Sequence, residues 1–352
     1  MPKIRINNIE LEAEEGESIL SVAGKAGIFI PVLCHKEGVE HYTSCMVCMV
    51  KENKTNDFLP SCSSLALDGL DIDASGEDVI SMRKKAVELL ISEHRAECEA
   101  PCRIVCPAGY NIPLMNRLLA SGEYRKAVDL IISELDAPEI RCKTCAGYCE
   151  NACRRKKIDR QISIRNIRIF ISQNLYYGGG PDHFIDQTEY RDLKNQFSSR
   201  PGKLDSNELQ EWLKECTGTS MRFESIENFE SAGEEARNCM HCDCRASEDC
   251  RLRDIAQAMG IKDKGRKVVN MPVTKKINHK TGLIFEHAKC IKCGLCVRVC
   301  EDSGNEPALC FINRGFISVI SEPLTMEFDD ILATQTDTCI NICPTGALSR
   351  FK

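Results

Sequence analysis

The sequence of 352 residues predicts a multidomain α+β protein. Residues 3–12 alternate apolar and polar side chains, as half-buried strands do. Residues 78–95 instead have the periodicity of an amphipathic helix. The length allows about two to four domains, and the 23 cysteines fall into separate groups along the chain. We expect four segments with these bounds: 1–77, 78–175, 176–270 and 271–352.

The cysteine content indicates bound metal in a reducing compartment. In a short secreted chain this density of cysteine would indicate disulfides. Here the chain is long, the count of 23 is odd, and the N-terminus (MPKIRINNIELEAEEG) lacks the apolar core of a signal peptide. Many cysteines are separated by only two or three residues, which suits one metal centre better than mutual bridging. We therefore expect reduced thiols and a cytoplasmic location.

Charge and hydropathy argue against two other classes. The formal net charge is −6 with Lys and Arg spread along the chain, whereas nucleic-acid binding needs massed positive charge. No apolar run approaches the length of a membrane span. We expect no nucleic-acid partner and no direct membrane insertion.

Residues 1–77 predict a small sheet with one short helix. Asn7-Asn8 lies between two apolar pairs and predicts a hairpin turn. Ser18 is placed to cap a short helix that Gly27 can end. The stretch DGLDIDAS, residues 68–75, predicts a closing strand.

Four cysteines in this segment have the spacing C-x10-C-x2-C-x13-C: Cys34, Cys45, Cys48 and Cys62. Four thiolates in such a loop-rich setting fit a [2Fe–2S] cluster, and a zinc site is the alternative. The pattern resembles the plant-type ferredoxin domain, in the variant at the front of the large iron–sulfur subunit of NADH:quinone oxidoreductase and of related hydrogenase subunits. This resemblance implies a β-grasp fold.

Residues 78–175 contain two groups of four candidate ligands: His94, Cys98, Cys102 and Cys106, then Cys142, Cys145, Cys149 and Cys153. Two groups of four are what two [4Fe–4S] clusters need, although zinc also takes four such ligands. The predicted helix over residues 78–95 ends at His94. In the complex-I-like family such a helix delivers a His ligand, but the spacing here departs from that family. The alternative for His94 is a solvated side chain at the helix C-terminus.

A second resemblance begins at Cys98. The motifs CEAPCRIVCPAGYNIP, TCAGYCENACRR and QISIRNIRIF resemble the N-terminal cluster domain of the glutamate synthase small subunit, and dihydropyrimidine dehydrogenase carries a similar domain. The resemblance implies a helical domain with two [4Fe–4S] clusters that passes electrons between a flavin and further clusters. It also implies that each cluster takes ligands from both cysteine groups.

The ligand sets of these two clusters stay open. The family commonly completes one cluster with a Gln or Glu, and the aligned position here is Arg168, which cannot ligate iron. Cys142 is additional and can replace that ligand. One partition therefore has two sets: His94, Cys98, Cys102 and Cys153, with Cys106, Cys142, Cys145 and Cys149. The other partition keeps two sequence-local sets.

Residues 176–270 predict a turn-rich linker and a helical cysteine-rich segment. No G-x-G-x-x-G follows a strand and no Gly-Lys-Ser/Thr loop is present, so we expect no nucleotide site in this chain. Cys216 stands alone and predicts a small buried hydrophobe rather than a ligand. His241 predicts an outward-facing hydrogen-bonding role. Four cysteines within a dozen residues predict a local [4Fe–4S] site, with zinc as the alternative: Cys239, Cys242, Cys244 and Cys250.

Residues 271–352 contain a C-x2-C-x2-C-x3-C run and a later C-x3-C-P. They resemble the bacterial two-cluster ferredoxin fold, in which the fourth ligand of each cluster comes from the other motif. The resemblance implies one [4Fe–4S] cluster with these ligands: Cys290, Cys293, Cys296 and Cys343. The second motif has lost two cysteines. Because only Cys300, Cys339 and the nearby Cys310 remain, we expect the second cluster to be absent.

These patterns predict one [2Fe–2S] cluster and about four [4Fe–4S] clusters in one chain. We expect an electron-transfer subunit that relays single electrons between a flavoprotein or NAD(P)H-binding subunit and a further redox subunit or ferredoxin. The clusters carry the electrons, so we expect no catalytic side chain. The alternatives are a chain that is itself a reductase or hydrogenase-type enzyme, and a zinc-binding scaffold.

Overall fold

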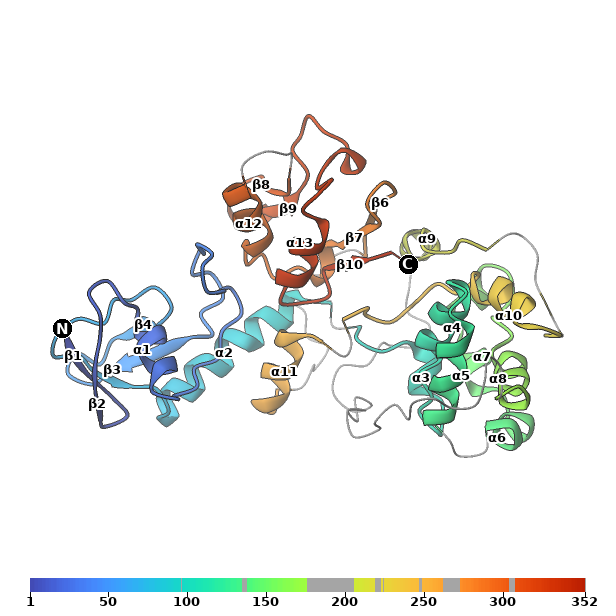
Figure 1. Cartoon of the computed structure of the whole chain (residues 1–352), viewed down its shortest axis with the longest axis horizontal. Coiled ribbons are helices and arrows are strands. Elements are labelled where there is room, and N and C mark those ends of the chain that lie inside the picture. Colours follow the sequence, from blue (N-terminus) through green and yellow to red (C-terminus); the bar gives the residue numbers. More distant parts are fainter. Residues whose placement is uncertain are drawn as a thin grey trace. The chain divides into compact units, whose positions relative to one another are not determined.

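The computed structural model describes residues 1–95, 97–134, 138–175, 206–218, 223, 225–246, 249–261, 273–303 and 308–351. The chain forms two compact units (Figure 1). The first comprises Met1–Arg95, Asp249–Pro272 and Lys276–Arg350, and the second comprises Ala96–Glu248, Val273–Lys275 and Phe351–Lys352. Most of the predicted linker, residues 176–205, lies outside the described residues.

The first unit begins with a five-stranded mixed sheet in the order β2-β1-β5-β3-β4. Its strands are β1 (Lys3–Ile6), β2 (Ile9–Glu12), β3 (Met49–Glu52), β4 (Phe58–Pro60) and β5 (Asp71–Asp73). The predicted hairpin turn is confirmed, because Asn7 and Asn8 both have positive φ, 49° and 67°, as a type I′ turn requires. The predicted strand near residue 70 exists as β5. It lies in the centre of the sheet, parallel to β1 and antiparallel to β3.

One helix, α1 (Ile19–Lys25), covers this sheet as predicted. Ser18 caps it, since its side chain accepts a hydrogen bond from the Ser21 backbone N–H at 3.2 Å. Gly27 follows the helix with φ 73°. Ile19 and Val22 pack against sheet residues, including Ile4 and Ile6, in a continuous core. The mixed α+β class is therefore confirmed.

The predicted amphipathic helix is α2 (Glu77–Glu93), with His94 at its C-cap. Glu77 and Asp78 lie in its first turn, where negative charge complements the helix dipole. The Arg83 Nε donates a hydrogen bond to the Met49 carbonyl oxygen at 2.8 Å and so fixes α2 to β3.

The rest of the first unit is a small α+β region near the C-terminus. Its three-stranded sheet has the order β10-β7-β6, and β8 pairs with β9 in an antiparallel ribbon. The elements are α11 (Arg251–Ala258), β6 (Lys275–Asn278), β7 (Leu283–Glu286), η3 (His287–Lys289), α12 (Leu295–Ser303), β8 (Cys310–Ile312), η4 (Gly315–Ile317), β9 (Val319–Ser321), η5 (Phe328–Asp330), α13 (Thr336–Ile342) and β10 (Leu348–Arg350). Helices α12 and α13 pack side by side.

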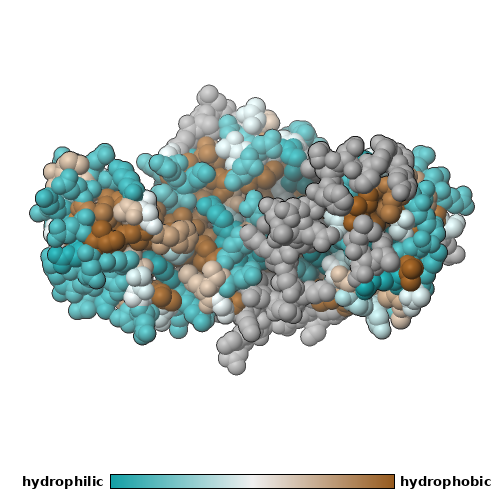
Figure 2. All heavy atoms as spheres, turned by 60° about the horizontal axis from the view of Figure 1, so that its bottom comes forward, coloured by the Kyte–Doolittle hydropathy of each residue, from teal (hydrophilic) through white to brown (hydrophobic). Residues whose placement is uncertain are grey.

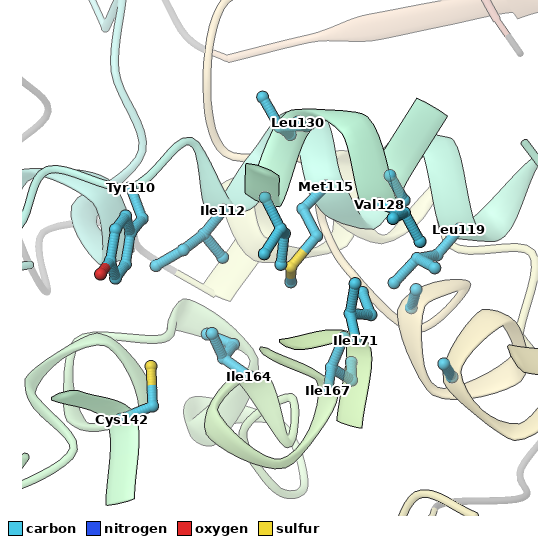
Figure 3. Packing of buried hydrophobic residues seen from close by; sticks show 14 of the residues in the cluster. Tyr110, Ile112, Met115, Leu119, Val128, Leu130, Cys142, Ile164, Ile167 and Ile171 are labelled. Atoms are coloured by element: carbon cyan, nitrogen blue, oxygen red, sulfur yellow. The ribbon is translucent and has the colours of Figure 1, made fainter. Parts of the chain in front are cut away.

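The described part of the second unit is helical. Its elements are α3 (Pro101–Ile104), α4 (Ile112–Ala120), α5 (Tyr124–Ser133), α6 (Pro138–Thr144), α7 (Tyr148–Asn151), η1 (Arg154–Lys157), α8 (Ile164–Gln173), α9 (Ser206–Leu213) and α10 (Phe229–Ala236). Figure 3 shows Ile167 and Ile171 of α8 close to Met115 and Leu119 of α4. Cys142 belongs to the same cluster of buried residues.

On the face that Figure 2 shows, apolar residues of the described part of the chain gather in patches among hydrophilic ones. Within the described residues, no helix combines the length and the apolar composition needed to cross a bilayer.

Replacing Ile167 by Ala should lower the free energy of unfolding by about 2–5 kcal/mol, because it leaves a cavity in the core between α4 and α8. Ile167 has no exposed surface. Ile140, which is 66% exposed on α6, is the matched control, and its replacement by Ala should change stability by at most about 0.5 kcal/mol. Denaturant titration of both anaerobically purified variants measures the difference. Equal losses would show that the α4–α8 core is not closed as described.

Candidate metal centres

None of the 23 cysteines, all of which lie in the described part of the chain, forms a disulfide bond, and several of them lie close together in groups. Among the described residues, no three His, Cys, Asp or Glu side chains lie close enough together to hold a single metal ion. The thiols of each group lie on loops or line a cavity, and some of them come from parts of the chain that are distant in sequence. Each group is described below from the elements that position it.

The four cysteines of residues 1–77 are brought together as expected. The loops before and after β3 and β4 carry Cys34, Cys45, Cys48 and Cys62, each at most 5% exposed. Cys48 Sγ and Cys62 Sγ are 3.3 Å apart. The Cys45 backbone N–H donates a hydrogen bond to Cys34 Sγ at 3.5 Å. Met46, directly after Cys45, has φ 54°, which turns this short loop tightly.

Hydrogen bonding within this group favours one thiolate in each pair. The Cys45 thiol lowers the pKa of Cys34 to about 5, and its own pKa is raised by the same interaction. The Cys62 thiol likewise lowers the pKa of Cys48 to about 7. Arg83 adds a positive charge beside Cys48, and its Nη2 has no hydrogen-bond partner in the described part of the chain. Lowered pKa values favour the thiolate form, which is the form that binds metal ions such as iron.

The four C-terminal cysteines of the predicted ferredoxin-like set also converge. Cys290 and Cys293 lie on the loop between η3 and α12, Cys296 lies in α12, and Cys343 caps the end of α13. The Lys292 backbone N–H donates a hydrogen bond to Cys290 Sγ at 3.3 Å, and Lys292 itself has φ 55°. Burial raises the pKa of Cys290 to about 12, and the nearby Cys343 thiol adds to this rise.

Two further thiols meet beside this set. Cys300 Sγ and Cys339 Sγ are 3.1 Å apart between α12 and α13. Cys310 lies in β8 opposite Ser321 of β9. The expectation that this pair holds no second cluster stays a prediction.

The two groups of the first unit approach each other. Burial raises the pKa of Cys293, the Cys343 and Cys290 thiols add to this rise, and Cys34 makes a smaller contribution, so Cys34 lies near Cys293. Tyr42 packs edge-on against Phe311, with ring centroids 5.4 Å apart, and the Arg298 guanidinium lies 4.2 Å above the Tyr42 ring. Gly294 has φ +77°, and a Cβ there would collide with the Tyr42 ring. This packing fixes the loop of Cys34 against that of Cys293.

In the second unit, a cavity of about 370 Å³ is lined by four thiols: Cys106, Cys142, Cys145 and Cys149. They come from the end of α3, from α6 and the loop after it, and from α7. These four form one set of the first predicted partition, in which ligands come from both cysteine groups. The sequence-local partition would separate Cys106 from the other three, and the choice between the two partitions stays a prediction.

Arg168 occupies the wall of the same cavity. It is 1% exposed, its Nη1 donates to Glu134 Oε2 at 3.0 Å, and its guanidinium carbon lies 3.6 Å from the Tyr110 ring centroid. Its Nε and Nη2 have no hydrogen-bond partner among the residues that the structure describes. Burial raises the pKa of Cys142, and the neighbouring Arg168 opposes that rise. Arg168 also hydrogen-bonds to the Cys142 side chain, so it presents a buried positive charge to a cavity lined by thiols, where bridging sulfides would accept further hydrogen bonds.

A second cavity in this unit gathers thiols that the sequence did not predict together. Its lining includes Cys102, Cys153, Cys239 and Cys242, and its volume is only about 20 Å³. The first predicted partition placed Cys102 and Cys153 with His94 and Cys98. His94 and Cys98 do not line this cavity. Spacing alone carried no signal for the group, because Cys102 and Cys239 are far apart in sequence.

The remaining predicted ligands are placed as follows. The Cys244 backbone N–H donates to the Cys98 carbonyl oxygen at 3.0 Å, so these two cysteines are neighbours in the second unit. Cys250 belongs to the first unit, where it caps the start of α11. His94 is 6% exposed, which contradicts the alternative of a solvated side chain.

Two other expectations need correction. His241 is 6% exposed and buried, so an outward-facing role is wrong. Its burial, with the charges of Arg117 and Arg245, lowers its pKa to about 3. Cys216 is half-buried rather than buried: it packs against the cluster of Trp212 and Met240, and its Sγ also lies 3.5 Å from Arg155 Nη1.

Comparison with known proteins supports two of these modules. Residues 2–76 match the family described as 2Fe–2S iron–sulfur cluster binding domain, and residues 83–178 match dihydropyrimidine dehydrogenase domain II, 4Fe–4S cluster.

Similar proteins include an NADH-quinone oxidoreductase subunit of Rhizobium meliloti, 26% identical over 43% of this chain and 19% of that protein. The gamma subunit of the NAD-reducing hydrogenase HoxS of Cupriavidus necator is 27% identical over 46% of this chain and 69% of that subunit. The match thus spans about a fifth of the first relative. A crystal structure of NAD+-reducing [NiFe]-hydrogenase in the H2-reduced state has the same fold, with a TM-score of 0.51 and 17% identity over 99% of this chain and 87% of that one.

Residues 2–178 therefore carry a 2Fe–2S iron–sulfur cluster binding domain followed by a 4Fe–4S domain of the dihydropyrimidine dehydrogenase type, and the chain is homologous to subunits of NADH-linked oxidoreductases and hydrogenases.

Proposed function

We propose that this chain is an electron-transfer subunit that relays single electrons between a flavoprotein or NAD(P)H-binding subunit and a further redox subunit or ferredoxin. The observation that carries this proposal is the approach of the Cys34 group to the Cys293 group within the first unit. Carriers that exchange electrons must be close together, and these two groups are held together by packed side chains. The relatives, which are named as subunits of NADH-linked complexes and hydrogenases, support it.

The residues fit iron–sulfur clusters in number, type and surroundings. In the proposal, Cys34, Cys45, Cys48 and Cys62 hold a [2Fe–2S] cluster. Two [4Fe–4S] clusters have the following ligand sets: Cys290, Cys293, Cys296 and Cys343, and Cys106, Cys142, Cys145 and Cys149. When bound, such clusters accept and donate single electrons with little rearrangement.

The protein's own groups act on the charge of these sites. The Cys45 and Lys292 backbone N–H groups donate to thiol sulfurs, and such bonds stabilise the additional negative charge of a reduced site. Arg83 and Arg168 add buried positive charge beside two of the groups. The apolar core around α4 and α8 limits the access of water to the sites in the second unit. We further propose a cytoplasmic location, in which the thiols stay reduced until they bind iron.

Replacing Cys45 by Ser should remove the [2Fe–2S] signal and leave the signals of the other clusters, because the groups are built from different loops. Low-temperature EPR of dithionite-reduced protein, with iron and sulfide analysis, measures this. Cys310, which lies apart in β8, is the control, and its replacement by Ser should change no signal. Zinc in place of iron would favour a scaffold, and a flavin bound to this chain would favour a catalytic reductase.

Replacing Gly294 by Ala should separate the Cys34 loop from the Cys293 loop, because the new methyl group collides with the Tyr42 ring. We expect both EPR signals to persist while the magnetic interaction between the two reduced clusters weakens. Gly315→Ala is the matched control: Gly315 also has positive φ, 61°, but nothing lies within 4 Å of a Cβ there. An unchanged interaction in Gly294→Ala would contradict the proposed route between these sites.

Replacing Arg168 by Gln should lower the midpoint potential of one [4Fe–4S] cluster, because a positive charge stabilises the reduced, more negative form. A change of about 60 mV corresponds to a tenfold shift in a one-electron equilibrium. Redox titration followed by EPR measures the potential. Arg168→Lys should restore part of it, and Arg125→Gln, on α5 outside the cavity lining, should leave it unchanged. An unchanged potential in Arg168→Gln would place the cluster elsewhere.

A further inference from the structure

We propose that Cys102, Cys153, Cys239 and Cys242 together hold one [4Fe–4S] cluster. The pair Cys239 and Cys242 then completes a site of the helical domain, instead of forming a local site with Cys244 and Cys250. This inference rests on the proposed function, because it assigns a further carrier of the same relay. The family match ends at residue 178, so it does not include the second pair of ligands.

The four thiols converge on one cavity of the second unit from three parts of the chain. Cys102 lies in α3, Cys153 precedes η1, and the other two follow α10. Their mutual proximity is also electrostatic: burial raises the pKa of Cys102 well above its usual value, and the thiols of Cys239, Cys153 and Cys242 raise it further. The cavity therefore brings two thiols of the α3 and η1 region together with two from the loop after α10.

The Cys239–Cys242 loop has the conformation of the Cys290–Cys293 loop. The residue before the second cysteine has a left-handed backbone in both, with φ 45° at His241 and 55° at Lys292. In both loops the backbone N–H of that residue bonds to the first cysteine, at 3.3 Å for Cys290. The same local geometry therefore presents two thiols to one side in the ferredoxin-like set and in the proposed site.

Buried polar groups in the cavity wall lack partners. Asn116 of α4 is 1% exposed, and its Oδ1 has no hydrogen-bond partner among the described residues. Arg154 donates to Glu97 through Nη1 and Nη2 at 3.4 and 3.3 Å, but its Nε has no acceptor in the described part of the chain. The Asn116 side chain also hydrogen-bonds to the Cys239 thiol. Asn116 and Arg154 therefore place buried hydrogen-bonding groups beside the thiols of this cavity.

Protein contacts fix the loop of Cys239 and Cys242 to the helical core. Arg117 of α4 forms a bidentate ion pair with Asp243, with distances of 2.8 and 2.6 Å. Arg237 Nε donates to the Ala120 carbonyl oxygen at 3.2 Å, and α10 packs along α4. The cavity of about 20 Å³ is room for little more than one water, so the thiols must rotate outward around a cluster. The loop that carries them is already in place.

Iron counting in a double variant tests the grouping. In anaerobically purified full-length protein, Cys102→Ala and Cys239→Ala should each lose about four irons and the same EPR signal. The variant with both changes should also lose about four irons, because both ligands serve one cluster. A loss of about eight irons in the double variant, or loss of different signals in the single variants, would show two separate sites and overturn the proposal.

Three controls distinguish this test from a failure to fold or of the relay itself. Cys216→Ala removes a thiol 3.3 Å from the Cys239 carbonyl oxygen but outside the cavity lining, and it should retain all iron. Cys106→Ala should remove a different signal. Persistence of the [2Fe–2S] signal shows that a variant is folded. Zinc at the Cys102 site alone would overturn this proposal only, whereas the absence of iron throughout would overturn the proposed function.

Discussion

The structure depends on the convergence of sulfur atoms from distant parts of the chain. Burying several thiols together disfavours their ionised forms. Burial accordingly raises the pKa values of Cys290 and Cys239 to about 12. Short loops with left-handed residues, backbone N–H donors and a few buried guanidinium groups partly offset this cost. The helices and sheets around them are short, so a cofactor that joins several segments would stabilise the fold as well as carry electrons.

The sequence predicted most of the local structure. The Asn7-Asn8 turn, the Ser18 cap and the helix ending at His94 all follow from short-range signals, and the structure contains them. The spacing also predicted that Cys34, Cys45, Cys48 and Cys62 lie close together, because short cysteine spacings reflect the geometry of one turn. The central position of β5 was not predictable from the sequence, since its parallel pairing with β1 depends on how the intervening chain returns to the sheet.

The grouping of the cysteines also depends on long-range packing that the sequence does not reveal. Cys106 lines one cavity with Cys142, Cys145 and Cys149, and Arg168 lies in the wall of that cavity, while the partition of these cysteines into ligand sets stays a prediction. The approach of Cys239 to Cys102 depends on the packing of α10 against α4 and on the pair of Arg117 with Asp243. Neither contact can be predicted from the spacing of residues in the sequence. The proximity of Cys239 to Cys102 is therefore seen only in the folded structure.

The left-handed residues of the cysteine loops limit how this protein can vary. His241 and Lys292 each occupy a backbone region that β-branched side chains enter only with strain, whereas Gly, Asn and Asp enter it readily. Substitutions at these two positions should therefore avoid Val, Ile and Thr, even though neither residue belongs to a proposed ligand set. The residues tolerated at these positions would then reflect the left-handed backbone conformation of the loops.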